Sequence, residues 1–455
     1  MVLQFSKSFS IVFALLLAAG CSSYGVVKNV PKDNTTIAPD SYSFSELSIG
    51  DTLDTDTSLI LAFSGGGTRA AALSYGVLLE LRDTKISAGG GIQRMLDEVD
   101  LISSVSGGSF TAAYYGLHGD DAFNDFEEVF LRRDIEGHLI RSLFNPLNWF
   151  KRSGRTENAV KYYEKEIFHG ATFADMKRKD GPLIVINASD LGHGVRFSFV
   201  QEYFNLLCSD ISSYPVARAV TASSAVPILF NPIVVKNYTD CKSEGEPQWL
   251  TDAMERAKGD PQLLLITHGL DSYFIRKDRE YVHFVDGGIT DNLGLRSVYE
   301  MVEVTGGAKA FMDKHHRSRP RRLVVISVNA STDPTPEMDA SNKQPGIGET
   351  IGSVTDVQLH RYNVATEEIM KNSIKRWAEN MSEPDHQVTP YYIQVEFRDI
   401  TPPSLIPFFN AIPTSFTLSD EQNDKLIKAG RDLLRNHPVY QQLVRDLGGT
   451  VVTEP

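Results

Sequence analysis

Twice within the first 120 residues, an apolar stretch of strand length runs into a glycine-rich turn and then into a helix-like segment. The apolar stretches are residues 59–63 and 99–105, and the segments that follow them are residues 70–81 and 109–117. Short continuous apolar runs predict buried strands. Strands that alternate with helices predict an α/β fold, in which a mostly parallel central sheet is flanked by helices on both faces.

Later parts of the chain repeat the alternation. Apolar runs predict strands at residues 183–187, 282–285 and 323–328, and a later or edge strand at 391–397. Helical patterns occur at residues 221–225, 351–381 and 420–436. Ser419 and Gln422 have the spacing of a capping box for the last of these helices. Because sites in such sheets form at the carboxyl ends of strands, we expect the functional groups in the glycine-rich turns.

Composition limits the classes of function. With 42% hydrophobic and 23% charged residues, the 455-residue chain is globular rather than disordered or collagen-like. A formal net charge of −13 argues against a nucleic-acid partner. The same charge gives no general attraction to anionic lipid, so contact with a membrane requires an anchor or a local patch.

The N-terminus is typical of an export signal. Residues 11–19 form an apolar run after Lys7, and small residues precede Cys21. This pattern resembles the bacterial lipoprotein signal, although Ala18 stands where Leu is usual. The alternative is an ordinary secretory signal that is cut nearby.

The resemblance implies that residues 1–20 are a signal peptide and that Cys21 is acylated and becomes the mature N-terminus. The domain would then be held at a bacterial cell envelope by its lipid anchor. The outer membrane is favoured because Ser22 differs from the Asp of the inner-membrane retention signal.

Residues 21–55 are polar, with scattered Pro, Ser, Thr and Asp, and predict a flexible spacer. We expect the catalytic domain over residues 56–455, with its core motifs in 58–300 and further strands and helices in 301–450. In an oxidising compartment, the remaining pair Cys208 and Cys241 suggests a disulfide. The alternative is a plain buried thiol at Cys208.

The turn after residues 99–105 has the pattern of a nucleophile elbow. Ser106 would project its hydroxyl above the sheet from a tight strand-to-helix turn. Such a turn needs small residues two positions before and two after the nucleophile, and Ser104 and Gly108 meet that need. The following helix would direct its N-terminus at Ser106, which favours developing negative charge there.

The first glycine turn, Gly65, Gly66 and Gly67, offers successive backbone N–H groups at a helix start. That arrangement suits an oxyanion hole. With Ala70 as its last position, the same segment also matches a dinucleotide-binding fingerprint. That interpretation requires an acidic residue at the end of the next strand. A turn without any ligand is a third interpretation.

Asp286 ends the apolar stretch 282–285, and Gly287 and Gly288 after it permit close approach of another backbone. A serine hydroxyl needs a base to remove its proton, and a carboxylate held against it in a dry site is one solution. An unperturbed Asp is a weak base at neutral pH. Taken alone, Asp286 is more typical of a turn or helix-capping residue.

These motifs, in this order, resemble the patatin-like phospholipase family over roughly residues 58–300. The resemblance implies an α/β fold related to the α/β-hydrolases and hydrolysis of acyl esters in lipids, with no cofactor and no metal. It assigns Ser106 as nucleophile, Asp286 as base and the N–H groups of Gly65, Gly66 and Gly67 as the oxyanion hole. Arg69 matches a position that is often basic, where it would brace the loop or meet a lipid phosphate.

Two other functions remain open. An acyltransferase would use the same two residues with another alcohol in place of water. A non-catalytic lipoprotein would bind lipid or a partner on an inactive scaffold. Oligomeric state, head-group preference and chain-length preference are not readable from the sequence.

Two further segments have mixed interpretations. Residues 139–155 combine aromatic and basic side chains, as in a membrane-interface segment or lid, or in a packed helix with a solvated end. The basic run 314–322 could meet lipid phosphates or form a solvated loop. Its adjacent His315 and His316 lack the spacing of a helix-borne zinc pair.

Overall fold

The computed structural model describes residues 24–32, 42–44, 56–88, 91–137, 155–178, 181–227, 229–239, 241, 245–275, 278–315, 317–333, 337–342 and 344–450. The expected signal peptide, Cys21 and nearly all of the segment 139–155 lie outside the described residues.

An eight-stranded sheet forms the centre, in the order β12-β11-β2-β5-β6-β10-β9, with β7 paired to β6. The strands from β12 to β6 are mutually parallel, whereas β7 and β10 run antiparallel to β6 and β9 runs antiparallel to β10. The mostly parallel sheet is confirmed, with β12 at its edge. The bounds are β2 (Thr57–Phe63), β5 (Val99–Val105), β6 (Leu183–Asp190), β7 (Val195–Ser198), β9 (Ile233–Lys236), β10 (Tyr281–Val285), β11 (Arg322–Asn329) and β12 (Thr389–Glu396).

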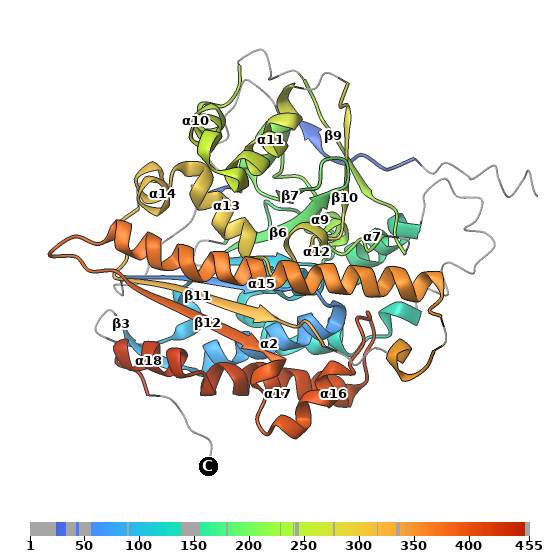
Figure 1. The fold of residues 1–455 in the computed structure, drawn as a ribbon, viewed down its shortest axis with the longest axis vertical. Coiled ribbons are helices and arrows are strands. Elements are labelled where there is room, and N and C mark those ends of the chain that lie inside the picture. The colour runs from blue at the N-terminus through green and yellow to red at the C-terminus, as the bar shows by residue number, and fades with distance from the viewer. Residues whose placement is uncertain are drawn as a thin grey trace, which may run out of the picture.

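Helices cover both faces of the sheet (Figure 1). One layer contains α2 (Gly67–Asp83), α3 (Gly107–His118) and α17 (Asp420–Asn436); the other contains α13 (Leu295–Thr305), α14 (Ala308–Lys314) and α15 (Ile347–Met381). Two pairs of short strands lie outside the main sheet: β1 (Val30–Pro31) with β8 (Ser209–Asp210), and β3 (Lys85–Ala88) with β4 (Gly91–Arg94). The other α-helices are α4 (Ala122–Phe126), α7 (Arg155–Glu166), α8 (Gln201–Leu206), α9 (Val216–Ser223), α10 (Gln248–Arg256), α11 (Pro261–Ile275), α12 (Gly288–Asp291), α16 (Ile406–Asn410) and α18 (Pro438–Asp446).

Local sequence explains where two of these helices begin. The expected capping box opens α17: the Gln422 N–H donates to Ser419 Oγ at 3.3 Å, and the Ser419 N–H donates to Gln422 Oε1 at 3.0 Å. Helix α9, expected at 221–225, instead starts directly after Pro215 and ends at Ser223. The helix was predicted too far toward the C-terminus, because the Ala- and Ser-rich residues that suggested it continue beyond the last helical turn.

Strand β10 approaches the sheet from beyond the carboxyl ends of the parallel strands. Its register pairs Phe284 with Asp190 and Val285 with Ser189 at the carboxyl end of β6. Because β10 overlaps only the last two residues of β6, its own carboxyl end lies at this same edge. The residue that follows, Asp286, is therefore delivered to the edge at which β5 ends in Val105.

The flexible spacer predicted for residues 21–55 is wrong for the described residues in it. Asn29 is buried and bridges to the edge strand β9: its Nδ2 donates to the Lys236 carbonyl at 2.8 Å, and its Oδ1 accepts the Lys236 N–H at 2.9 Å. An asparagine side chain has the same donor and acceptor as a peptide group, so Asn29 extends the sheet edge. Further along, the buried Tyr42 hydroxyl is hydrogen-bonded to both the N–H and the carbonyl of Ile184. The folded domain therefore begins before residue 56.

Cys208 and Cys241 form a disulfide, with their Cα atoms 5.5 Å apart. It joins the chain after α8 to the chain after β9, closing a loop with a sequence separation of 33. In the chain-entropy picture a loop of this length contributes about 3–4 kcal/mol of stability.

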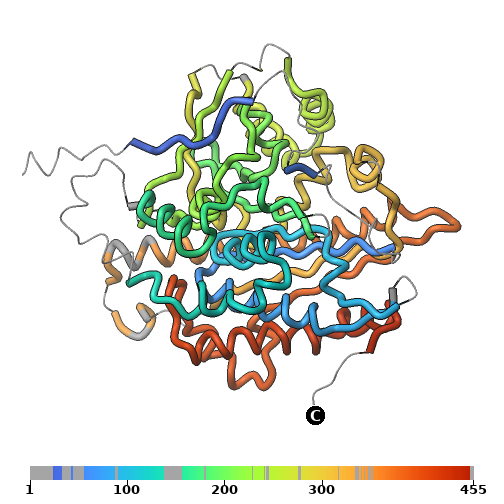
Figure 2. The backbone as a smooth tube through the Cα atoms, turned by 180° about the vertical axis from the view of Figure 1, so that it is seen from behind, coloured from blue at the N-terminus to red at the C-terminus, as the bar shows by residue number. Residues whose placement is uncertain are grey.

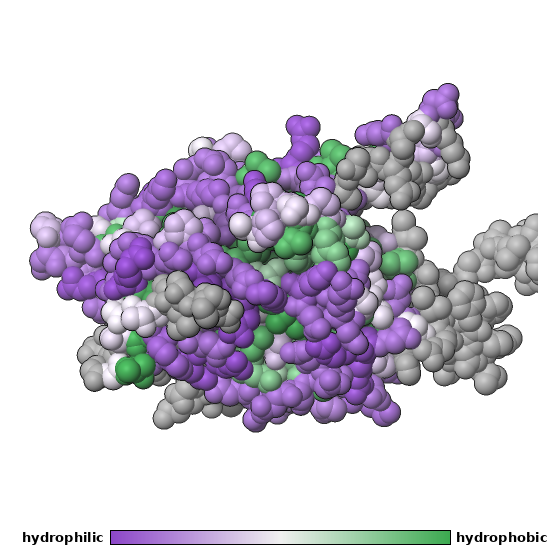
Figure 3. Space-filling view, turned by 90° about the horizontal axis from the view of Figure 1, so that it is seen from below, coloured by the Kyte–Doolittle hydropathy of each residue, from purple (hydrophilic) through white to green (hydrophobic). Residues whose placement is uncertain are grey.

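The surface is largely hydrophilic on the face that carries α16, α17 and α18, with some apolar residues showing in a hollow near its middle (Figure 3). Several cations of the basic run 314–322 are paired: Arg319 with Glu383, and Arg321 with Asp56. Within the described part of the chain, no helix is both long enough and apolar enough to cross a bilayer.

Candidate active site

Ser106 lies in a tight turn between β5 and α3. Its backbone has φ 49° and ψ −118°, a conformation that side chains rarely adopt and that costs about 1–3 kcal/mol. The turn is crowded: a Cβ on Gly107 would lie 1.9 Å from the Gly67 carbonyl oxygen, and one on Gly108 would lie 2.7 Å from the Phe63 Cβ. Glycine is therefore required at both positions, and Gly108 is the small residue that a nucleophile elbow needs two positions after the nucleophile.

Two further motif residues lie in tight surroundings. Ser104 is fully buried, and its hydroxyl donates to the Val185 carbonyl of the neighbouring strand at 3.2 Å. A Cβ on Gly287 would lie 2.4 Å from the Asn187 carbonyl oxygen. The absence of a side chain at Gly287 therefore lets the turn after β10 pack directly onto β6.

The hydroxyl of Ser106 donates a hydrogen bond to Oδ2 of Asp286 at 2.8 Å. The other carboxylate oxygen, Oδ1, accepts the Gly288 N–H, also at 2.8 Å. Both side chains are buried, with Ser106 6% and Asp286 9% exposed. The two motifs that the sequence separates are thus in direct contact, and Gly288 helps to fix the orientation of the carboxylate.

Burial changes the acidity of this carboxyl group. Removal of Asp286 from water raises its pKa to about 6, and the hydrogen bonds from Gly288 and Ser106 oppose that rise in part. At neutral pH the group is still ionised, but it is a stronger base than a solvated Asp. The raised pKa reduces the difference in proton affinity between the Asp286 carboxylate and the serine hydroxyl that it must deprotonate.

The end of α9 connects the turn that carries Ser106 to the turn that carries Asp286. The Ser223 hydroxyl accepts the Ser106 N–H at 2.8 Å and donates to the Asn187 carbonyl at 2.6 Å. The Ser223 carbonyl in turn accepts the Gly287 N–H at 3.0 Å. Sequence reasoning assigned no role to Ser223; its place in a Ser- and Ala-rich segment was the only available signal.

The glycine loop is an N-terminal cap of α2 packed against the turn of Ser106. The N–H of Gly65 donates to the Asn292 carbonyl at 2.9 Å, so the assignment of Gly65 as an oxyanion donor is wrong. Within the described residues, the N–H groups of Gly66 and Gly67 have no hydrogen-bond partner. Their φ angles of 137° and 61° need glycine. The loop therefore offers two N–H groups rather than three.

Arg69 braces this loop from within. The side chain is 4% exposed, and its guanidinium donates to the Ala330 carbonyl at 2.8 Å and to the Thr414 hydroxyl at 3.1 Å. Burial lowers its pKa to about 10, which leaves it charged at neutral pH. Of the two roles expected for Arg69, bracing fits these contacts and binding of a lipid phosphate does not.

Aromatic side chains line the helix that follows Ser106. Phe110, one turn along α3, has Phe416 edge-on at 6.2 Å between ring centroids and Phe130 stacked at 4.4 Å. Phe416 in turn meets Phe230 edge-on at 6.2 Å. Phe110 is fully buried, whereas Phe230, which follows α9, and Phe416, which follows the contact of Ser415 with the glycine loop, are partly exposed.

The dinucleotide interpretation of the glycine loop does not fit. Strand β5, the next parallel strand, ends in Ser104 and Val105 rather than in an acid. A Cβ on Gly67 would lie 2.4 Å from the Ser415 carbonyl oxygen, so the 411–417 segment already lies against the loop. Among the residues that the structure describes, no group of three or more His, Cys, Asp or Glu could hold a metal ion.

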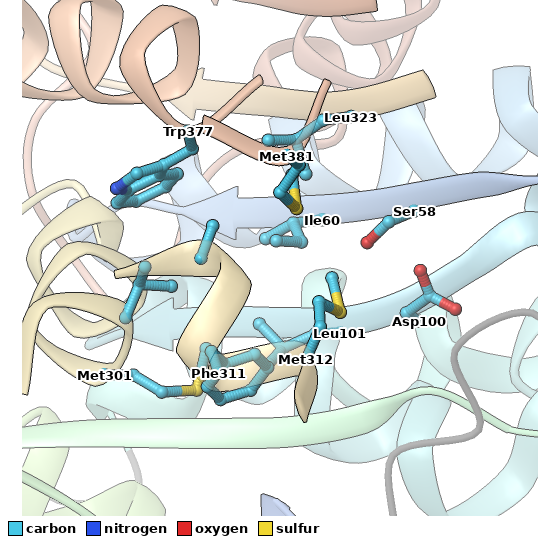
Figure 4. Close-up of a pocket in the computed structure, with 12 residues that line it drawn as sticks. Ser58, Ile60, Asp100, Leu101, Met301, Phe311, Met312, Leu323, Trp377 and Met381 are labelled. Carbon is cyan, nitrogen blue, oxygen red and sulfur yellow. The ribbon is translucent and has the colours of Figure 1, made fainter. Parts of the chain in front are cut away.

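A small apolar cavity of about 30 Å³ lies elsewhere, between the sheet and α13, α14 and α15 (Figure 4). Ser58 and Asp100, at the amino ends of β2 and β5, are among its lining residues. Because Ser106 follows the carboxyl end of β5, this cavity is at the opposite edge of the sheet from the dyad.

The chain is similar to a known protein family and to solved structures. The family model for patatin-like phospholipase matches residues 61–299, more than half of the chain. The structure is similar to human GIVD cytosolic phospholipase A2, at 12% sequence identity and a TM-score of 0.39, over 86% of this chain and 62% of that one. No curated protein matches.

A second structure of the human enzyme, in complex with methyl γ-linolenyl fluorophosphonate, matches at 12% identity and a TM-score of 0.34, over 90% of this chain and 62% of that one. This chain therefore spans less than two thirds of the human enzyme's length. The glycine loop, Ser106 and Asp286 all fall within the residues that the family model matches. The chain therefore belongs to the patatin-like phospholipase family, a family of lipid hydrolases.

Proposed function

We propose that this protein is a serine lipid acyl hydrolase of the phospholipase A or lysophospholipase type, with Ser106 and Asp286 as its catalytic dyad. The observation that carries the proposal is the 2.8 Å hydrogen bond from the Ser106 hydroxyl to Asp286, at a turn with the strained backbone of a nucleophile elbow. The raised pKa of Asp286 supports its role as the base.

In the first step, Ser106 Oγ attacks the ester carbonyl carbon while Asp286 takes the hydroxyl proton. The carbonyl oxygen becomes an oxyanion that accepts hydrogen bonds from the N–H groups of Gly66 and Gly67. The positive ends of the α2 and α3 helix dipoles stabilise its negative charge. Collapse of this intermediate breaks the bond to the alcohol, which leaves with the proton from Asp286. The fatty acyl group remains as an ester of Ser106.

In the second step, Asp286 takes a proton from water as the water oxygen attacks the acyl carbon. The same N–H groups hold the second oxyanion. The bond to Ser106 Oγ then breaks, and Oγ recovers its proton from Asp286. A free fatty acid leaves, and the dyad returns to its starting state without a metal or a cofactor.

Two partly exposed rings near the site support an acyl chain as the group that is transferred. Phe230 and Phe416 present apolar surface, and Phe416 packs edge-on against the buried Phe110 of the helix that follows the nucleophile. Contact with such rings favours an aliphatic chain over a polar group, at about 25 cal/mol for each Å² of apolar surface removed from water.

We further propose that the protein is a lipoprotein of a bacterial cell envelope, anchored through acylated Cys21 and more specifically to the outer membrane. The apolar run before Cys21 supports the anchor. The Cys208–Cys241 disulfide supports an oxidising compartment.

The direct test is incubation of the purified protein with defined phospholipids, lysophospholipids and neutral esters, with Ser106→Ala alongside. Release of fatty acid that depends on Ser106 supports the hydrolase. Acyl transfer to an added alcohol in preference to water would favour the acyltransferase. Failure of a fluorophosphonate probe to label Ser106 in folded protein would favour a non-catalytic lipid-binding lipoprotein.

A further inference from the structure

The described N-terminal segment, residues 24–32, lies along the sheet edge in a defined direction. Gly25 lies against Val234 near the start of β9, where a Cβ would meet the Val234 Cγ2 at 2.1 Å. Asn29 is hydrogen-bonded to Lys236 at the other end of that strand. Following the segment backward from Asn29 to Gly25 therefore leads toward the start of β9.

The start of β9 lies at the catalytic edge. In the register of β9 with β10, Ile233 pairs with Phe284, two residues before Asp286. A contact to α9 supports this placement: Arg218, 2% exposed, donates from Nη1 to the Val26 carbonyl at 3.0 Å. Arg218 precedes Ser223 by five residues of helix, about 7.5 Å along the axis.

The pictures agree with this direction. In Figure 1 the strands β11 and β12 point to one side of the molecule, and the N-terminal segment lies toward that same side; Figure 2 shows the segment from behind. Cys21 precedes Tyr24 by three residues, so their Cα atoms are at most about 11 Å apart. An acyl chain on Cys21 would therefore be tethered close to the catalytic edge.

Aliphatic side chains are exposed on that edge. The apolar rim, as we call it, consists of residues that are 50–58% exposed: Leu229, Ile289, Val354 and Val357. Ile289 directly follows Gly288, which binds the Asp286 carboxylate. Leu229 is in the connection that runs from the end of α9, beside Ser106, to the start of β9.

The two valines lie where α15 extends past the sheet. Asn363 of α15 donates to the Ser331 hydroxyl, two residues beyond the end of β11, at 3.0 Å. Helix α15 runs back along the sheet from there, so its earlier turns project outward. Val354 precedes Asn363 by nine residues, which places it about 14 Å further out along the helix axis.

We propose that residues 24–32 form an orienting strap that holds the catalytic edge and its apolar rim against the bilayer to which Cys21 is anchored. The proposal rests on the lipoprotein and hydrolase assignments above and identifies a phospholipid surface as the partner of the rim. A flexible spacer of 35 residues would leave the domain free to turn, whereas a short tether beside the active site limits the orientations that it can adopt. Ester groups of the membrane then lie next to Ser106.

The test uses full-length protein, acylated in a bacterial host and reconstituted into vesicles of phosphatidylethanolamine and phosphatidylglycerol that carry a nitroxide-labelled lipid. A single fluorophore is attached at Val357→Cys or, as a matched control, at Ile92→Cys. Ile92 is also aliphatic and 79% exposed, but it lies in the β3–β4 hairpin that precedes the amino end of β5. We expect the nitroxide to quench the label at position 357 at least three-fold more than the label at position 92.

A second pair of variants tests the strap itself. Asn29→Ala removes the hydrogen bonds to Lys236, whereas Lys28→Ala changes an exposed neighbour. Asn29→Ala should reduce the difference in quenching between the two labels, and Lys28→Ala should preserve it. Equal quenching at both positions in the otherwise unaltered protein, or failure of the protein to remain with the vesicles, would overturn the proposal.

Hydrolysis of a soluble short-chain ester, measured on the same samples, separates this proposal from the proposed function. An active enzyme with equal quenching at both positions rejects the orienting strap alone. Selective quenching at position 357 without any ester turnover supports the strap and rejects the hydrolase.

Discussion

Ser106 and Asp286 are 180 positions apart in the chain, yet the hydroxyl of one lies 2.8 Å from the carboxylate of the other. The short overlap of β10 with the carboxyl end of β6 produces this contact, because it places the end of β10 at the same edge of the sheet as the end of β5. Ser223 holds the two turns together through Ser106 and Gly287. The geometry of the dyad is thus a property of the sheet topology and of the end of α9.

The acidity of Asp286 predicts the pH dependence of catalysis. Because burial raises its pKa to about 6, the proposed base is protonated below that pH, and kcat/KM should fall about ten-fold per pH unit. The measurement is hydrolysis of a soluble ester from pH 4.5 to 8. Asp291→Asn is the control, because burial also raises the pKa of Asp291 to about 6. If the inflection in kcat/KM disappeared in Asp291→Asn, it would report the titration of Asp291 and not that of Asp286, which would contradict this prediction.

The same shift predicts that Asp286 lowers the stability of the fold. Its pKa is raised from 3.8 to about 6 on folding, so the folded state binds more protons between these values and stability falls as pH rises through this range. Asp286→Asn should therefore increase the free energy of unfolding at pH 7 by up to about 3 kcal/mol, with little gain near pH 4. Denaturant unfolding at both pH values checks this. An equal effect at the two pH values would contradict the shift.

Gly66 tests the glycine loop. A Cβ there would meet the Ala70 Cβ at 3.3 Å, so space is tight but available, and φ of 137° adds strain. Gly66→Ala should lower kcat about 10²–10³-fold, the usual cost of a disturbed oxyanion donor. Gly170→Ala introduces the same side chain at a positive φ, with no other atom within 4 Å of the new Cβ. Gly170→Ala should lose about as much stability as Gly66→Ala but keep its turnover. An equal loss of turnover in both variants would refute the assignment of Gly66 as an oxyanion donor.

Ser223 tests the connection between the two turns. Ser223→Ala leaves the buried N–H of Ser106 without its acceptor, which costs about 1–3 kcal/mol of stability and loosens the turn that positions Ser106, so kcat should fall with little change in KM. Ser223→Thr keeps a hydroxyl and should restore much of the activity. Ser224→Ala is the matched control, because the Ser224 hydroxyl donates only within α9, to the Val220 carbonyl at 2.8 Å. A comparable loss in the Ser224 variant would indicate a general effect of the helix end.

The sheet and the positions of Ser106 and Asp286 were predictable because their signals are local. Apolar runs bounded by glycine turns mark β2 and β5, and Ser106 and Asp286 each stand at the end of such a run. The direction of β10 was not predictable, because a short apolar run has the same composition in either orientation.

Roles that depend on tertiary partners were missed or misassigned. Gly65 looked equivalent to its neighbours, but its N–H is taken by the Asn292 carbonyl. The N-terminal segment looked like a spacer because its composition is polar, whereas the Asn29 amide pairs with β9 as a backbone group would. In both cases the partner is distant in sequence, so no local pattern could reveal it.

The central claim is that Ser106 and Asp286 together hydrolyse lipid esters. Fatty acid release from defined phospholipids and lysophospholipids, measured for the unaltered protein, Ser106→Ala and Asp286→Asn, tests it most directly, with unfolding curves showing that each variant folds. We predict release by the unaltered protein and a loss of at least 10³-fold in both folded variants. Substantial hydrolysis by the Ser106 variant, or an Asp286 variant as active as the unaltered protein, would contradict the account.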